Sequence, residues 1–146
     1  CGLDMLSCGP LERGEREDPL WTSRKLSARK LFVPDALRVQ ARTTADELRQ
    51  MADVFAEKLN RATGPTLMMI PSRGLSSLSE EGRPLCDFEA DAALTVRLKE
   101  RLGGNVEVLE VNLPLNTKEF GEMAALELLR MMGVDREQFV GGVAAN

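Results

Sequence analysis

The chain has 146 residues, of which 43% are hydrophobic and 29% charged, so a single folded domain is expected rather than a disordered, collagen-like or coiled-coil protein. The net charge of −4 offers no general attraction for a phosphate backbone, and we expect no general nucleic-acid binding. Histidine and tyrosine are absent, so any chemistry must use carboxylates, lysine, serine, threonine, cysteine or backbone groups.

The first expected element is a strand over residues 2–7, which is short, mostly apolar and followed by Gly9-Pro10. The sequence enters this strand without a polar lead-in, so we expect a fragment of a larger protein. Asp4 lies inside the apolar segment, where an unpaired carboxylate is costly. Asp4 therefore needs a partner or a functional role.

A charged stretch over residues 11–30 follows, with Trp21 as its large apolar anchor, and predicts a surface excursion. The basic run at 24–30 is typical of a solvated face, and a local anion site is the alternative. Residues 31–33 and 38–42 predict two short extended segments near a sheet edge, because a proline separates them.

Each expected helix begins with a recognisable capping residue. Thr44 and Glu47 form a capping box at the start of the clearest helix, whose apolar stripe runs to Leu59. Asp87 is expected to cap the second helix. Asn116 is expected to cap the last helix, which should bury Phe120, Met123, Ala124, Leu126, Leu128 and Met131.

The continuous apolar run Thr66 to Ile70 predicts a strand in the middle of a parallel sheet. Residues 106–111 alternate between apolar and acidic and predict a strand nearer an edge. The alternation of strands and helices predicts a three-layer α/β domain over residues 1–132, with a mostly parallel, Rossmann-like sheet flanked by helices. Residues 133–146 are expected to form a partly disordered tail.

Ligands bind beyond the carboxyl ends of the strands in such folds, which here means the loops 8–14, 71–78 and 112–116. The middle loop offers a glycine, hydroxyl donors and a guanidinium, which suit a phosphate or carboxylate. An ordinary glycine-serine connection is the alternative, because no established phosphate-loop pattern is present. The candidate cofactor-binding residues are Asp4, Ser72, Arg73, Gly74, Ser76, Ser77 and Asn116.

Other polar groups suggest weaker candidates. Asp87, Glu89 and Asp91 have the chemistry for magnesium binding or acid–base catalysis, but capping and the helix dipole explain Glu89 and Asp91, so no metal site is assigned. The three cysteines are odd in number and form no C-x-x-C pair, which predicts reduced thiols in a cytoplasmic protein. No apolar run approaches the about 20 residues that span a bilayer.

Several motifs occur in order along the chain, including Leu3-Asp4-Met5, Arg42-Thr43-Thr44, Ile70-Pro71-x-x-Gly74-x-Ser76, Asp87-x-Glu89-Ala90-Asp91 and Asn116-x-x-x-Phe120. Together they resemble the carboxyl-terminal part of the tomato mosaic virus resistance protein family. This resemblance implies an ATP-binding fold with two α/β halves, of which this chain supplies the last part. It also implies ATP with Mg²⁺ as the ligand, with the main phosphate-binding loop outside this stretch.

Three classes of function are therefore open. The chain is expected to belong to a nucleotide-binding protein and to contribute to its ligand site and assembly. The alternatives are a protein-interaction module without a ligand of its own and a carboxylate-dependent enzyme whose catalytic residues are unassigned. We also expect a homodimer whose interface involves residues 1–42, because short strands there lack an obvious core.

Overall fold

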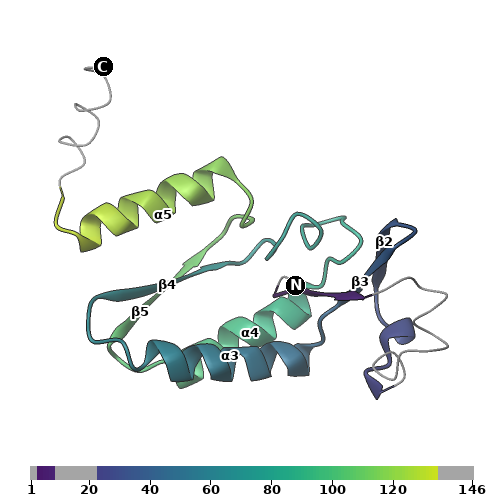
Figure 1. Ribbon diagram of the computed structural model, residues 1–146. Coiled ribbons are helices and arrows are strands. Elements are labelled where there is room, and N and C mark those ends of the chain that lie inside the picture. The colour runs from purple at the N-terminus through teal and green to yellow at the C-terminus, as the bar shows by residue number, and fades with distance from the viewer. Residues whose placement is uncertain (1–2, 9–22, 135–146) are drawn as a thin grey trace.

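The computed structural model describes residues 3–8 and 23–134. Its strands are β1 (Met5–Cys8), β2 (Leu31–Asp35), β3 (Arg38–Arg42), β4 (Thr66–Pro71) and β5 (Val106–Val111). Its helices are the short 3-10 turn η1 (Leu26–Ala28) and the α-helices α3 (Ala45–Leu59), α4 (Phe88–Arg101) and α5 (Lys118–Met131). Figure 1 shows α3 and α4 side by side beneath β4 and β5, with α5 on the other side of these strands.

The strands form two separate sheets, and this corrects the mostly parallel sheet expected from sequence. Strands β1, β3 and β2 form an antiparallel sheet in that order, while β4 and β5 form a two-stranded parallel sheet. The reason lies in the connection between β2 and β3, a turn at Ala36 and Leu37. So short a turn permits only antiparallel pairing, because parallel strands need a long crossover. Strand β2 lies at an edge, but β3 is the middle strand.

The parallel pairing predicted for the strand at Thr66 to Ile70 is confirmed, but its predicted place in the middle of the sheet is wrong, because β4 pairs only with β5 among the described strands. Thr66 pairs with Val106 and Pro71 with Val111, in register along the whole of β4. Lys99 of α4 pairs with Glu110, and Arg130 of α5 pairs with Glu107 at 2.6 Å. Because residues 107 and 110 point to opposite faces of a strand, α4 and α5 lie on opposite faces of this small sheet.

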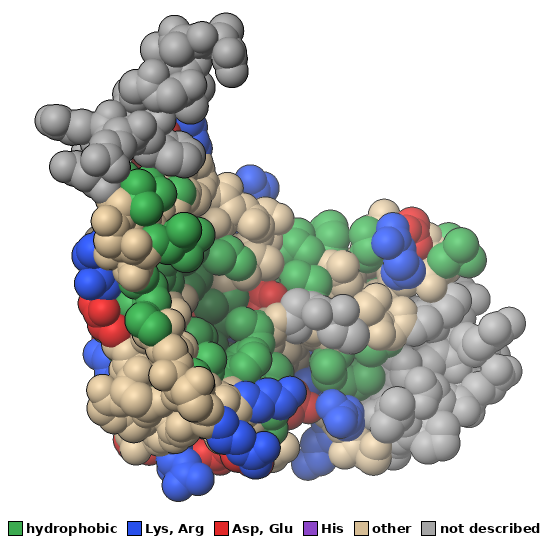
Figure 2. All heavy atoms as spheres, turned by 60° about the vertical axis from the view of Figure 1, so that its left-hand side comes forward, with side chains coloured by type: hydrophobic (Ala, Val, Ile, Leu, Met, Phe, Trp, Pro, Cys, Tyr) green, Lys and Arg blue, Asp and Glu red, His purple; other side chains and the backbone are tan. Residues whose placement is uncertain are grey.

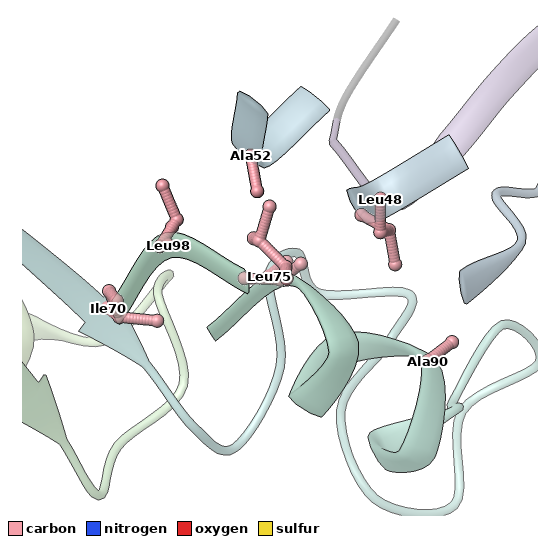
Figure 3. Packing of buried hydrophobic residues seen from close by; sticks show 7 residues of the cluster. Leu48, Ala52, Ile70, Leu75, Ala90 and Leu98 are labelled. Atoms are coloured by element: carbon pink, nitrogen blue, oxygen red, sulfur yellow. The ribbon is translucent and has the colours of Figure 1, made fainter. Parts of the chain in front are cut away.

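The main core lies between α3, α4 and β4. Leu48 and Ala52 of α3 meet Leu94 and Leu98 of α4, and Ile70 and Leu75 close the cluster from β4 and the loop after it (Figure 3). Leu48 and Leu98 have no exposed surface. Each fully buried leucine contributes about 1.5–3 kcal/mol to stability. The packed pair of helices α3 and α4 is therefore a stable support for the loops attached to it.

Two of the three predicted caps are confirmed. Thr44 accepts from the Glu47 amide at 3.3 Å and Glu47 accepts from the Thr44 amide at 3.0 Å, completing the capping box of α3. Asp87 caps α4 by accepting from the Ala90 amide at 3.1 Å. The prediction for α5 is wrong, because Thr117 and not Asn116 is the cap. The Thr117 hydroxyl oxygen accepts from the Phe120 amide at 3.3 Å.

Helix α5 buries much less than its sequence predicts. Phe120 is its one buried residue, whereas Met123, Leu126 and Leu128 are 36%, 39% and 57% exposed. Figure 2 shows hydrophobic side chains gathered beside this helix, over a hollowed part of the surface. The predicted tail from residue 135 onward lies outside the described residues.

Candidate functional site

Arg42, at the end of β3, joins three segments that are far apart in the sequence. Its Nη1 donates to the Asp4 carbonyl at 2.7 Å, and its Nη2 donates to the Asp87 carbonyl at 3.1 Å. The same Nη2 forms an ion pair with the Asp91 carboxylate of α4. The Arg42 side chain is only 3% exposed, so these bonds form in the interior. Arg42 therefore fixes the amino-terminal end of α4 against β3 and the segment before β1.

Asp4 has the partner that its position in an apolar segment required. The Ser76 hydroxyl donates to Asp4 Oδ2 at 2.5 Å, and Asp4 is fully buried. The Thr43 amide donates to the Asp4 carbonyl at 3.0 Å. The structure thus brings together two of the candidate site residues, Asp4 and Ser76, and uses both for internal hydrogen bonds.

The loops that follow β4 and β5 lie side by side, as their place at the carboxyl ends of parallel strands predicts. The Ser72 amide donates to the Val111 carbonyl at 2.9 Å, and the Leu115 amide donates to the Gly74 carbonyl at 3.0 Å. The Ser72 hydroxyl also donates to the Val111 carbonyl at 3.3 Å. These bonds make one continuous edge from the two loops.

The remaining candidates in these loops point to the surface. Arg73, Ser77 and Asn116 are exposed. No hydrogen bond or ion pair of the Arg73 guanidinium occurs within residues 3–8 and 23–134. The guanidinium is therefore available to a ligand that approaches this edge.

Gly74 is required by the packing of the chain. Its φ is +134°, a conformation that residues with a side chain rarely adopt. A Cβ atom there would lie 3.0 Å from the Glu80 backbone nitrogen. The absence of a side chain at Gly74 therefore allows the chain to approach the Glu80 backbone closely.

A cleft of about 420 Å³ lies between the amino-terminal ends of α3 and α4. It is lined by residues from the segments 28–30, 42–45 and 87–90. On its rim, Lys30 Nζ donates to the Cys86 carbonyl at 2.5 Å and lies 3.4 Å from the Asp87 carboxylate. The cleft therefore combines a half-exposed lysine with the starts of two helices.

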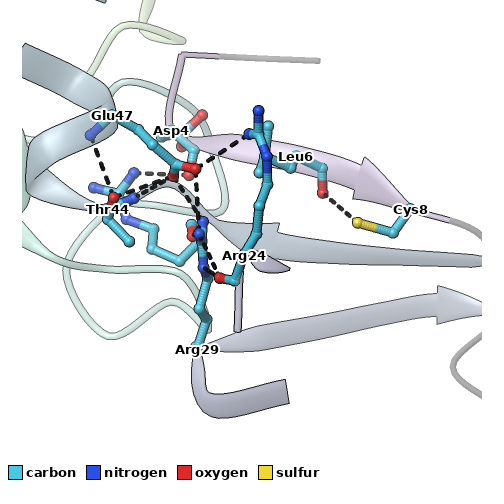
Figure 4. A network of polar contacts seen from close by, with 8 residues as sticks. Asp4, Leu6, Cys8, Arg24, Arg29, Thr44 and Glu47 are labelled. Carbon is cyan, nitrogen blue, oxygen red and sulfur yellow. Dashed lines mark hydrogen bonds and ion pairs between the residues drawn. The ribbon is translucent and has the colours of Figure 1, made fainter. Parts of the chain in front are cut away.

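Glu47 binds two residues of the basic run, Arg24 and Arg29, as Figure 4 shows. Its carboxylate accepts from Arg29 at 2.7 Å and from Arg24 at 3.2 Å, in addition to its role in the capping box. Although partial burial favours the neutral acid, the hydrogen bonds from Arg29 and Thr44 hold the pKa of Glu47 below its usual value. Much of the basic run predicted at 24–30 is thus engaged with α3.

The pKa values of Asp87 and Asp91, at the start of α4, are shifted in opposite directions. Burial raises the pKa of Asp91 above its usual value, and the nearby charges of Asp4 and Asp87 act in the same direction against the attraction of Arg42. Burial also acts on Asp87, but its hydrogen bond from Ala90 and the charge of Lys30 outweigh it, so the Asp87 pKa is lowered.

Several buried polar atoms around Arg42 have no hydrogen-bond partner among residues 3–8 and 23–134. They are Asp4 Oδ1, Arg42 Nε, Thr43 Oγ1 and Asp91 Oδ2. Arg42 and Thr43 were noted in the sequence only as part of a family motif, and Lys30 only as part of a basic run. The composition of β3 does not distinguish Arg42, because the strand carries a second arginine, Arg38, which is exposed.

Two further searches gave negative results within the part of the chain that the structure describes. No group of three or more cysteine, aspartate or glutamate residues is arranged to hold a metal ion there. None of the helices in this part is long and apolar enough to cross a membrane.

Comparison with known proteins identifies relatives over most of the chain. Residues 1–132 match the uncharacterised protein family UPF0261, C-terminal domain. A UPF0261 protein of Clostridium tetani is 34% identical over 131 residues, which is 89% of this chain and 30% of that protein. The ToMV resistance protein Tm-1 of Solanum lycopersicum is 36% identical over 120 residues, which is 81% of this chain and 15% of that protein.

A UPF0261 protein of Rhizobium meliloti is 32% identical over 120 residues, which is 81% of this chain and 30% of that protein. The chain thus spans less than a third of the length of these curated relatives. The family resemblance expected from the sequence motifs is confirmed at this level.

Proposed function

Because this chain belongs to the UPF0261 family as its C-terminal domain, we propose that it contributes one edge of a nucleotide-binding site to a larger protein. The observation that carries this proposal is the continuous edge formed by the loops after β4 and β5, with the free guanidinium of Arg73 on it. Open α/β sheets bind their ligands at this position. Arginine suits a phosphate group because it donates two parallel hydrogen bonds.

The other loop residues have distinct parts in the proposed site. The exposed side chains of Ser77 and Asn116 supply further polar contacts to a nucleotide. Ser76 and Asp4 act indirectly, because their mutual hydrogen bond of 2.5 Å holds the loop after β4 in place. The main phosphate-binding loop and the Mg²⁺ that accompanies ATP belong to another part of the larger protein in this proposal.

Calorimetry with ATP and Mg²⁺ tests the proposed edge. We expect Arg73→Ala to weaken ATP binding about tenfold, the value of one charge-assisted hydrogen-bonded contact. Arg61→Ala is the matched control, because Arg61 is exposed near the start of β4, at the opposite end of the sheet, and pairs only with the exposed Glu57. Equal ATP affinity in both variants would show that Arg73 has no part in binding.

The same titration on the full-length relative from Clostridium tetani tests where the main phosphate site lies. We expect ATP to bind the full-length protein much more tightly than the 146-residue chain. Equal affinity would place the main site within this domain and contradict that part of the proposal.

Assembly is a second function that one observation favours. Met123, Leu126 and Leu128 of α5 and its C-cap Met132 are exposed large hydrophobic residues, and apolar surface of this kind is often covered by another chain. We therefore propose a homodimer, with α5 in addition to residues 1–42 in its interface; Trp21 lies outside the described residues. Sedimentation of the chain and of Leu128→Lys tests this proposal. A 16.1 kDa monomer in both cases would reject it.

A further inference from the structure

The cleft between α3 and α4 combines features of an anion site. Both helices begin at it, and the amino-terminal end of a helix carries a partial positive charge and unsatisfied amides. The caps use the amides of Glu47 and Ala90, which leaves the earlier amides of each first turn. Ala45 and Glu89, which line the cleft, belong to these first turns.

Two buried side chains on the same cleft lack partners. Thr43 is 1% exposed and its hydroxyl oxygen has no hydrogen-bond partner, and the same holds for the Nε of Arg42, which is 3% exposed. Both residues line the cleft. Buried polar groups in folded proteins nearly always have a partner, so these atoms indicate a group outside the described residues 3–8 and 23–134. This observation is independent of the helix ends.

From these observations, we propose that the cleft binds a small oxyanion, the carboxylate or phosphate group of a small molecule, through Lys30, Thr43 and the first-turn amides of α3 and α4. Lys30 is the exposed cation of this site. Its side chain is 51% exposed and its partners are a carbonyl and the Asp87 carboxylate at 3.4 Å. Lys30 can therefore turn from Asp87 to a ligand without breaking the core.

The charges around the cleft set the class of ligand. Arg29, Lys30 and Arg42 line it together with Asp87 and Glu89. Glu47 and Asp91 are not among the lining residues. Glu47 pairs with Arg29, and Asp91 pairs with Arg42. The two lining carboxylates repel a polyphosphate chain, so a group of low charge fits. None of the residues that line the cleft belongs to the loops 71–78 and 112–116, so this site is separate from the nucleotide edge near Arg73.

The cleft also gives a role to two sequence motifs. Arg42-Thr43-Thr44 and Asp87-x-Glu89-Ala90-Asp91 lie far apart in the chain but meet around this one cavity. Arg42 holds them together through the Asp87 carbonyl and the Asp91 carboxylate. The buried pair therefore acts as a positioning contact that keeps the two helix starts at a fixed distance.

Amide chemical shifts of the full 146-residue chain, titrated with inorganic phosphate and separately with acetate, test the proposal. We expect the amides of Ala45 and Glu89 to shift and saturate with at least one of the two anions. Lys30→Gln should weaken that binding about tenfold. Lys58→Gln, which removes the same charge at the far end of α3, should leave it unchanged.

Thr43→Val distinguishes binding from a purely structural role. The substitution removes a hydroxyl without a partner, so the thermal midpoint should stay the same or rise, while anion affinity falls about threefold or more. Arg73→Ala should leave cleft binding intact, which separates this proposal from the nucleotide edge. Absent or non-saturating shifts at Ala45 and Glu89, or equal affinity in the Lys30 and Lys58 variants, would overturn it.

Discussion

The Arg42 guanidinium and the Asp91 carboxylate form a buried ion pair between β3 and α4, with side chains 3% and 9% exposed. A charge in this environment is stable only while its partner is present, since desolvation costs several kcal/mol per ion. The same guanidinium holds the carbonyls of Asp4 and Asp87. The contact therefore couples the platform of α3 and α4 to the antiparallel sheet.

Removing one member of this pair should be strongly destabilising. We expect Asp91→Ala to lower the free energy of unfolding by about 3–5 kcal/mol, because Arg42 is left buried and uncompensated. Urea denaturation followed by circular dichroism measures this. The control is Glu57→Ala, which removes the exposed partner of Arg61 and should change stability little. Similar losses in the two variants would contradict a special role for the buried pair.

The protonation of Asp91 gives a pH dependence of known sign. Because burial raises its pKa above the usual 3.8, the folded chain holds this proton more tightly than the unfolded chain. The contribution of Asp91 to the free energy of unfolding is fully present when the pH is below the usual pKa of an aspartate. It is lost as the pH rises through the raised pKa of Asp91. The unfolding free energy of the native chain minus that of D91N should therefore fall as the pH is raised above about 4.

Glu47 should show the opposite slope. Its pKa is lowered by Arg29 and Thr44 despite partial burial, so its contribution is present above the usual value of 4.5 and is lost on acidification. The unfolding free energy of the native chain minus that of E47Q should therefore increase as the pH rises. If both differences changed in the same direction, the assignment of one of the two pKa shifts would be wrong.

Gly74 should tolerate no side chain. Its φ of +134° and the 3.0 Å approach to the Glu80 backbone make Gly74→Ala strained in both conformation and space. We expect a loss of about 1–3 kcal/mol, measured by thermal unfolding. Gly64→Ala is the control, since no atom lies within 4 Å of a Cβ atom there. A neutral Gly74→Ala would mean that the loop can move away from Glu80.

Local sequence signals predicted much of the fold. The capping box of Thr44 and Glu47 depends on residues three apart, and the Asp87 cap is equally local. The apolar run from Thr66 to Ile70 predicted a parallel strand, and β4 pairs in parallel with β5 along its whole length. Such patterns depend on a few neighbouring residues and can be recognised without tertiary information.

The centre of the site could not be found in this way. Arg42 and Asp91 are 49 positions apart, and nothing in either local pattern indicates the other. The antiparallel sheet was missed because a two-residue turn, at Ala36 and Leu37, decides the pairing direction. Helix α5 was expected to be buried because its composition is apolar, but the contacts that would cover it do not come from the described residues.

The start of α5 offers a last test, because the structure and the sequence pattern assign its cap to different residues. Thr117 accepts from the Phe120 amide at 3.3 Å and donates to the Pro114 carbonyl at 2.9 Å, whereas Asn116 is exposed. Thr117→Ala should therefore cost about 1 kcal/mol, and Asn116→Ala only a small fraction of that.

Hydrogen exchange of the α5 amides measures this difference directly, because loss of a cap frays the helix from its first turn. We expect faster exchange at Phe120 in Thr117→Ala and native exchange in Asn116→Ala. The reverse ranking would restore Asn116 as the cap. It would also move the start of α5 one residue closer to Leu115, at the edge where we propose that a nucleotide binds.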